Sequence, residues 1–285
     1  NGSRPNILWL TAEDISPNLG CYGDAYARTP NLDAFAQSGV RYTRAFATAP
    51  VCSPARSCLI TGMFATSLGT QRLRSQFPIP QDVRGFSSLL RDAGYYCSNN
   101  VKTDYNIRNE KTFIADAWDE SSARAHWRKR RPGQPFFAVF NFMTTHQSRT
   151  SVWPHEQFEN EIGAKLSPDE RHDPETATLP PYYPDTAEAR RAWARYHDCI
   201  TLMDHEAGEM LRRLGVPRAV LAAQPGDQLA DVLGIDLRQP SGHGRSAGLR
   251  ELPHFLRTQP TRDDLDLRRP GIESAVGVEE LEGER

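Results

Sequence analysis

The chain has 285 residues, enough for one large α/β domain or two small ones with a substantial buried core. Its 34 basic and 36 acidic side chains leave a formal charge of −2, which gives no electrostatic reason to expect binding to nucleic acid or an anionic membrane. No apolar run reaches the length of a membrane span, and the five cysteines lack the spacing of a metal site or a disulfide framework.

The first predicted element is a buried parallel strand over Pro5 to Leu10, an apolar run that leads to Glu13 and Asp14. Loops at the carboxyl ends of such strands hold ligands in open α/β sheets. Two adjacent carboxylates suit a hard divalent cation such as calcium, and a solvated turn or a helix cap is the alternative.

Two scaffold elements follow. Thr29 and Pro30 predict the start of a helix that runs through Ala36. The β-branched and aromatic residues in Val40 to Phe46 predict a strand that leads back toward Cys52.

The segment from Cys52 to Arg56 has the composition of an anion site. Pro54 suits the first turn of a helix, which places Cys52 at the positive helix end, where a thiolate or another anion is stabilised. Arg56 lies one turn further and offers a planar fork of donors to an oxyanion. The alternative is a buried structural cysteine beside a surface arginine.

Two further strands are predicted to end near this site. A helix over Phe86 to Gly94 precedes a strand over Tyr95 to Val101, and Lys102 follows it. The apolar run Pro135 to Phe142 is the clearest buried strand, and His146 lies just beyond it. Without further context, Lys102 would be a surface charge and His146 an incidental loop residue.

The last third of the chain changes character. We expect a long loop over Trp153 to Pro184 and one long amphipathic helix over Thr186 to Leu214. Residues 215–285 contain a single aromatic residue, Phe255, and are rich in Arg, Gly and Pro, so they have little with which to build a core.

These residues resemble the type I sulfatase family. Its signature Cys-x-Pro-x-Arg is matched by Cys52-Ser53-Pro54-Ala55-Arg56, and the Leu59-Ile60-Thr61-Gly62 continuation also fits. The acidic pair, Cys21-Tyr22-Gly23 and Thr29-Pro30-Asn31-Leu32-Asp33 follow the family's order. The resemblance implies that a formylglycine-generating enzyme oxidises Cys52 to formylglycine, whose hydrate attacks sulfur.

The resemblance also assigns the metal ligands. Glu13, Asp14 and the modified Cys52 would bind one calcium ion. Glu13 stands where the family usually has aspartate, and its longer side chain moves the ligating oxygen.

The remaining site residues are implied in the same way. Arg56 and Lys102 would contact the sulfate, and His146 would protonate the leaving oxygen or nitrogen. Asp104 stands where the family has a histidine, so no role is carried over to it.

The implied fold is α/β, an alkaline-phosphatase-like, mainly parallel mixed sheet flanked by helices. Residues 1–214 would form the N-terminal catalytic domain, and residues 215–285 would be a divergent, truncated or frame-shifted tail. Residues 219–223 are a thin candidate strand. In Ser241-Gly242-His243-Gly244, glycine replaces the aspartate of the family's second metal-binding motif.

The function that we predict is hydrolysis of sulfate esters or sulfamates, with a sulfated glycan as substrate. The sequence is most similar to the heparan N-sulfatase, or sulfamidase, branch, and a periplasmic or secreted location is expected although no signal peptide is visible. Two alternatives stay open: a catalytically dead remnant that binds sulfated glycans, and a phosphoester or phosphonate hydrolase of the same superfamily.

Overall fold

The computed structural model describes residues 4–215, which all lie in one unit of the chain, Asn1–Ile235. The predicted tail, apart from Gly215, falls outside the described residues, as do the candidate strand at 219–223 and the motif Ser241 to Gly244. Within the described range, no helix combines the length and the apolar character needed to cross a bilayer.

The centre of the fold is a parallel sheet. Its strands are β1 (Ile7–Ala12), β2 (Tyr96–Asn100), β3 (Glu120–Ser121) and β4 (Phe136–Phe142), in the order β1-β4-β2-β3. All three pairings are parallel, which agrees with the predicted α/β sheet. The continuous apolar run of β4 explains its central place, because a central parallel strand is covered on both faces. Within residues 4–215, β1 pairs on one side only.

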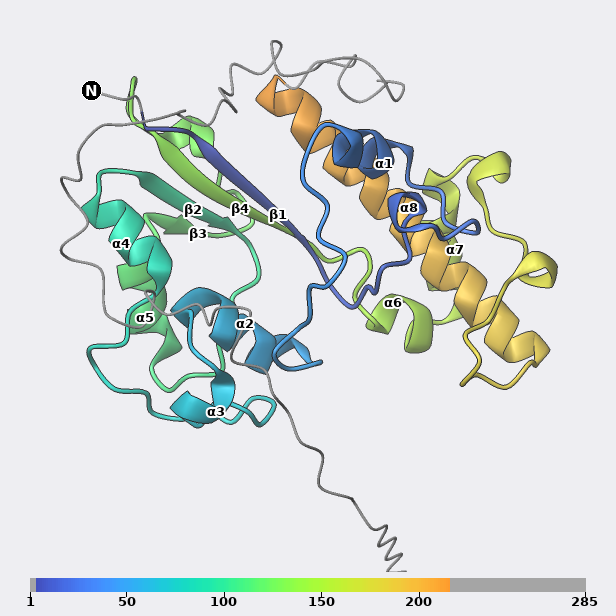
Figure 1. Ribbon diagram of the computed structural model, residues 1–285, viewed down its shortest axis with the longest axis horizontal. Coiled ribbons are helices and arrows are strands. Elements are labelled where there is room, and N and C mark those ends of the chain that lie inside the picture. The colour runs from blue at the N-terminus through green and yellow to red at the C-terminus, as the bar shows by residue number, and fades with distance from the viewer. Residues whose placement is uncertain (1–3, 216–285) are drawn as a thin grey trace, which may run out of the picture. The chain divides into compact units, whose positions relative to one another are not determined.

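Helices fill the connections between these strands (Figure 1). The α-helices are α1 (Pro30–Gln37), α2 (Cys52–Thr61), α3 (Ala65–Leu68), α4 (Phe86–Asp92), α5 (Glu110–Ala117), α6 (Ser148–Ser151), α7 (His155–Glu161) and α8 (Ala187–Leu214). Short 3-10 helices are η1 (Gly20–Tyr22), η2 (Trp127–Lys129), η3 (Gly163–Lys165), η4 (Pro168–Glu170) and η5 (Pro174–Thr176). The predicted helices at 31–36, 86–94 and 186–214 and the strands at 5–10, 95–101 and 135–142 are confirmed within a few residues.

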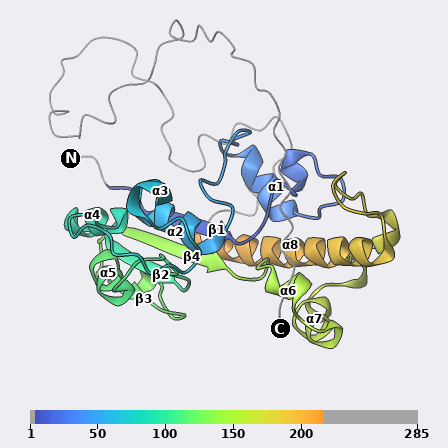
Figure 2. The same ribbon diagram turned by 90° about the horizontal axis from the view of Figure 1, so that it is seen from below.

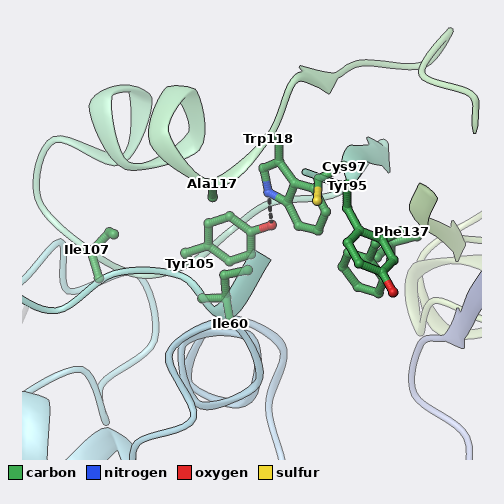
Figure 3. Packing of buried hydrophobic residues seen from close by; sticks show 9 residues of the cluster. Ile60, Tyr95, Cys97, Tyr105, Ile107, Ala117, Trp118 and Phe137 are labelled. Carbon is green, nitrogen blue, oxygen red and sulfur yellow. Dashed lines mark hydrogen bonds between the residues drawn. The ribbon is translucent and has the colours of Figure 1, made fainter. Parts of the chain in front are cut away.

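Side chains of successive strand residues point to opposite faces of the sheet, so β4 contributes to two cores. Phe137 and Val139 pack against α2, α4 and α5 in a cluster that includes Ile60 and Trp118 (Figure 3). Trp118 stacks on Phe137 with ring centroids 5.7 Å apart, and its indole N–H donates to the hydroxyl of Tyr105. This cluster holds the body of α2 against the sheet.

The opposite face of the sheet packs against η2 and the end of α8. Phe136, Ala138 and Phe140 form this second cluster with Trp127 and Met210. Figure 2 shows that α8 extends well beyond the sheet, with α1 on one side of it and α7 on the other.

Helix α8 also orders neighbouring segments through buried carboxylates. Asp204, which is fully buried, accepts hydrogen bonds from the backbone N–H groups of Asn31 and Leu32 and so caps the start of α1. Asp198 accepts from Arg171 Nε at 2.7 Å and from His172 Nδ1 at 2.8 Å. Both aspartates act as structural groups.

Two predicted elements differ from the structure. Val40 to Phe46 is irregular and not a strand. The side chains of Tyr42 and Phe46 are 72% and 87% exposed, so the strand propensity of this segment is not matched by packing against the sheet. The predicted long loop over Trp153 to Pro184 contains α7 and three 3-10 helices. Helices this short leave no periodic pattern in the sequence.

Candidate active site

The first residue of α2 is Cys52, and Pro54 lies in its first turn, as predicted. The unpaired N–H groups of a helix start favour a nearby anion. Burial nevertheless raises the pKa of the Cys52 thiol, and the adjacent carboxylate of Asp104 raises it further against the lowering effect of Lys102. The pKa of the thiol is thus shifted in the direction opposite to the one that a helix start alone favours.

Asp104 is a site residue that the sequence did not single out. Its carboxylate raises the pKa of the Cys52 thiol, and it stands at the position where the resembled family has histidine. The backbone of Asp104 has a φ of 52°, in the left-handed region that non-glycine residues seldom adopt.

Arg56 lies one turn further along α2 and is 8% exposed. Its Nε donates to the carbonyl of Thr103, and its Nη2 donates to the carbonyl of Lys102, each at 2.6 Å. Arg56 Nη1 lies 3.3 Å from Glu13 Oε1. The guanidinium therefore joins the nucleophile helix to the loops that follow β1 and β2.

Glu13 lies between two cations. Lys102 Nζ is 2.8 Å from Glu13 Oε2, while Arg56 approaches the other carboxylate oxygen. The side chains of Glu13 and Lys102 are only 7% and 12% exposed, so water screens this charge group weakly. This group contains three of the six residues that the sequence predicted, and its two cations and one carboxylate leave it with a net positive charge.

Polar residues on three neighbouring strands support Arg56. These residues are Thr11, Asn99 and Asn141. Each lies two positions after an apolar strand residue of the cluster around Phe137, so its side chain lies on the same face of the sheet as that cluster. Asn141 Oδ1 accepts from Arg56 Nη2 at 2.9 Å and from Thr11 Oγ1 at 2.8 Å. Asn141 Nδ2 donates to Asn99 Oδ1 at 2.9 Å. Sequence reasoning missed Asn141, because it lies inside an apolar run.

We expect Asn141→Leu to lower the free energy of unfolding by about 2–3 kcal/mol, because it leaves buried donors and acceptors unpaired. Thr11→Val, which removes a single hydrogen bond, should cost only about 1 kcal/mol. Urea denaturation of both variants checks this prediction. Equal losses for the two variants would contradict a central role for Asn141.

A second group of side chains could hold a metal ion. Ligand atoms of Glu13, Asp14 and His146 all lie within 4.8 Å of one another. Asp14 has a φ of 50°, and its Oδ2 accepts from the backbone N–H of Gln147 at 2.8 Å, which ties the β1 loop to the loop carrying His146. Two carboxylates fit a hard cation, whereas the imidazole is a less usual ligand for calcium. Cys52, also predicted as a ligand, is not part of this group of the described residues.

Glu206 on α8 supports the loop that carries His146. Its two carboxylate oxygens accept from Thr144 Oγ1 at 2.8 and 2.7 Å. Burial raises the pKa of Glu206, although Thr144 and nearby cations oppose the shift. Sequence reasoning did not find Glu206, because its partner lies 62 residues away along the chain.

We expect Glu206→Gln to raise stability at neutral pH. A carboxyl whose folded pKa is raised stabilises the fold fully below its unfolded pKa of about 4.5, and that contribution is lost as pH rises through the folded pKa. The glutamine variant should thus match the parent in acid and exceed it at pH 7 in thermal melts. Glu209→Gln on the same helix should show the opposite sign, because Arg213 and Arg212 lower the pKa of Glu209.

Comparisons with known proteins agree with this geometry. An ulvan-active sulfatase of Formosa agariphila is 35% identical over 246 residues, 74% of this chain and 41% of that protein. A solved 2-O GAG sulfatase aligns over 76% of this chain and 55% of its own, with a TM-score of 0.53 and 17% identity. A phosphonate monoester hydrolase of Silicibacter pomeroyi aligns over 74% of this chain and 59% of its own, with a TM-score of 0.52 and 17% identity. At such identities the two structures establish the fold alone.

The chain thus spans less than half the length of its Formosa agariphila relative. The family model described as Sulfatase matches residues 5–237, which include β1, the start of α2 and all the site residues described above. The chain belongs to the sulfatase family.

Proposed function

We propose that this chain is the nucleophile-bearing part of a sulfatase that hydrolyses sulfate esters or sulfamates of a sulfated glycan. The observation that carries the proposal is Cys52 at the start of α2, with Arg56 and Lys102 gathered around Glu13 beside it. Two cations near a helix N-terminus form a positive site suited to a tetrahedral anion. The family and the glycan-active relative support the same reaction class.

Cys52 is proposed to require conversion to formylglycine by a separate generating enzyme, and the raised pKa of its thiol supports this, because a raised pKa disfavours direct attack by the thiolate. One hydroxyl oxygen of the hydrated aldehyde would attack sulfur, and the bond from sulfur to the sugar oxygen or nitrogen would break. The second hydroxyl would then lose its proton and expel sulfate, which restores the aldehyde. Arg56 and Lys102 offset negative charge on the sulfate oxygens, and Lys102 can exchange its contact with Glu13 for one with the substrate. His146 donates a proton to the leaving oxygen or nitrogen.

Glu13 and Asp14 are the residues that would hold a calcium ion, with the modified residue 52 as a further ligand. The ion would polarise the sulfate oxygens when bound. Its charge would also compensate the Glu13 carboxylate after Lys102 turns to the substrate. The two carboxylates at one sheet edge support this part of the proposal.

The finer assignments rest on sequence resemblance. The sulfamidase-like branch and an N-sulfated, heparan-like substrate follow from the motif context of Cys52. Residues 1–214 are proposed as the N-terminal catalytic domain, and a periplasmic or secreted location fits a glycan-degrading hydrolase.

The test is release of inorganic sulfate from heparin oligosaccharides by the full chain, produced together with a formylglycine-generating enzyme. We expect sulfate release and a peptide mass that shows the aldehyde at residue 52. A phosphonate monoester serves as the competing substrate, since the fold is shared with a phosphonate hydrolase. Faster turnover of the phosphonate, or glycan binding without sulfate release from fully modified protein, would overturn the proposal.

A further inference from the structure

The segment 70–77 after α3 presents two arginines at the protein surface. Arg72 and Arg74 are exposed, and within residues 4–215 neither side chain forms an ion pair or a hydrogen bond. The exposed Arg84, in contrast, binds Asp92 and Asp116. The positive charges of Arg72 and Arg74 are therefore available to a ligand.

The backbone of this segment is held in place by Asn106, which is only 3% exposed. Asn106 Nδ2 donates to the carbonyls of Thr70 and Arg72, and its Oδ1 accepts from the N–H of Ser75, each at 2.6 Å. A buried amide with three such bonds fixes the turn before any ligand arrives. Preorganisation of this kind lowers the entropic cost of binding.

The segment also keeps an unfavourable conformation. Arg74 and Gln76 have φ values of 54° and 49°, and Asn106 has a φ of 63°. A non-glycine residue in the left-handed region is strained, because its Cβ comes too close to the following carbonyl oxygen. Strain of this kind persists where the surroundings enforce it, and it concentrates at functional sites.

The segment adjoins the candidate active site. The backbone N–H of Arg74 donates to Ser53 Oγ at 3.1 Å, and the fully buried Ser53 is the residue after Cys52. Asn106 also lies two residues after Asp104, whose carboxylate raises the pKa of the Cys52 thiol. The backbone of Arg74 therefore contacts the residue that follows Cys52, and Arg72 is two residues away along the chain.

The side chain between the two arginines completes a surface suited to a charged sugar. Leu73 is 50% exposed, so an apolar group lies between two cations in sequence. A charged sugar offers the matching combination of an apolar C–H face and anionic substituents. Guanidinium groups bind carboxylates and sulfates through paired hydrogen bonds.

We propose that Arg72 and Arg74 form a second anion subsite, which binds a carboxylate or a further sulfate on the sugar next to the one being desulfated. This inference rests on the proposed function. The subsite makes the enzyme prefer polyanionic glycans over small sulfate esters.

The experiment compares the parent with the double variant Arg72→Gln/Arg74→Gln. For each we measure hydrolysis of a heparin tetrasaccharide and of 4-nitrophenyl sulfate, which lacks a second anion. We expect the ratio of the two kcat/KM values to fall at least about tenfold, since one charge-assisted hydrogen bond is worth that much. The fall should come from KM. Arg128→Gln, an exposed arginine of η2 on the opposite face of the sheet, is the matched control and should keep the parent ratio.

Binding of the same tetrasaccharide by the unmodified thiol form, measured by calorimetry, separates this inference from the proposed function. An arginine-dependent Kd supports the subsite even if no sulfate is released. A tetrasaccharide whose carboxyl groups have been reduced distinguishes the two anions. If its Kd is the same for the parent and the double variant, the arginines bind the carboxylate. If its Kd still differs between the two proteins, they bind a second sulfate. Equal Kd values for parent and double variant, or an equal loss on both substrates, would overturn the inference.

Discussion

Cys52→Ala is expected to abolish sulfate release, with a loss of at least about a thousandfold in kcat. In the proposed mechanism residue 52 supplies the attacking oxygen, and removal of a covalent nucleophile costs at least this much in other hydrolases. Alanine at the first position of α2 should leave the helix intact, because it is a good helix former. The assay is inorganic sulfate release, with thermal melting to confirm the fold.

The control for this variant is Cys21→Ala, which removes another partly exposed thiol, near Asp33 and away from the start of α2. It should retain the parent activity. Sulfate release by Cys52→Ala at more than a few per cent of the parent rate would refute the role of residue 52.

Arg56→Ala is expected to lower the free energy of unfolding by about 3–5 kcal/mol, because it removes one member of a buried ion pair and leaves polar groups unpaired. The substitution takes donors from Asn141 Oδ1 and from the carbonyls of Lys102 and Thr103. It also leaves Glu13 with Lys102 as its remaining cation in the described site. Urea denaturation measures the loss, and sulfate release should become undetectable.

Two further variants make this result specific. Arg56→Lys keeps the charge but not the planar fork, so it should recover only part of the stability. Arg84→Ala breaks an exposed, solvent-screened ion pair on the α4 side of the protein and should cost far less stability than Arg56→Ala. If Arg56→Ala and Arg84→Ala unfold at the same urea concentration, the buried network around Asn141 has no structural role.

Several elements could be predicted because their patterns determine their environment. The apolar run of β4 specifies a strand that is buried on both faces. The amphipathic pattern of α8 specifies a helix that is buried on one face. Val40 to Phe46 shows the limit of such predictions. Its residue types favour a strand, but they do not reveal whether a neighbouring strand exists to pair with it.

The candidate site was predictable where residues follow a parallel strand or begin a helix. Glu13, Lys102 and Cys52 come together because the carboxyl ends of β1 and β2 and the start of α2 share one sheet edge. Asn141 could have been found from the two-residue period of a strand, because that period places its side chain on the same face as Phe137 and Val139. The partners of Glu206 and Asp104 depend on loop conformations, which no pattern in the sequence specifies.

The outer position of β1 affects how this chain behaves in concentrated solution. Within residues 4–215 one side of Ile7–Ala12 has no neighbouring strand, and these six residues are apolar enough to favour strand addition. An extended segment that reaches this edge can extend the sheet by main-chain hydrogen bonding, and copies of the same chain become more available for this as concentration rises. Among the described residues, the strand that leads to the acidic pair is therefore also an open edge at which a second chain can add.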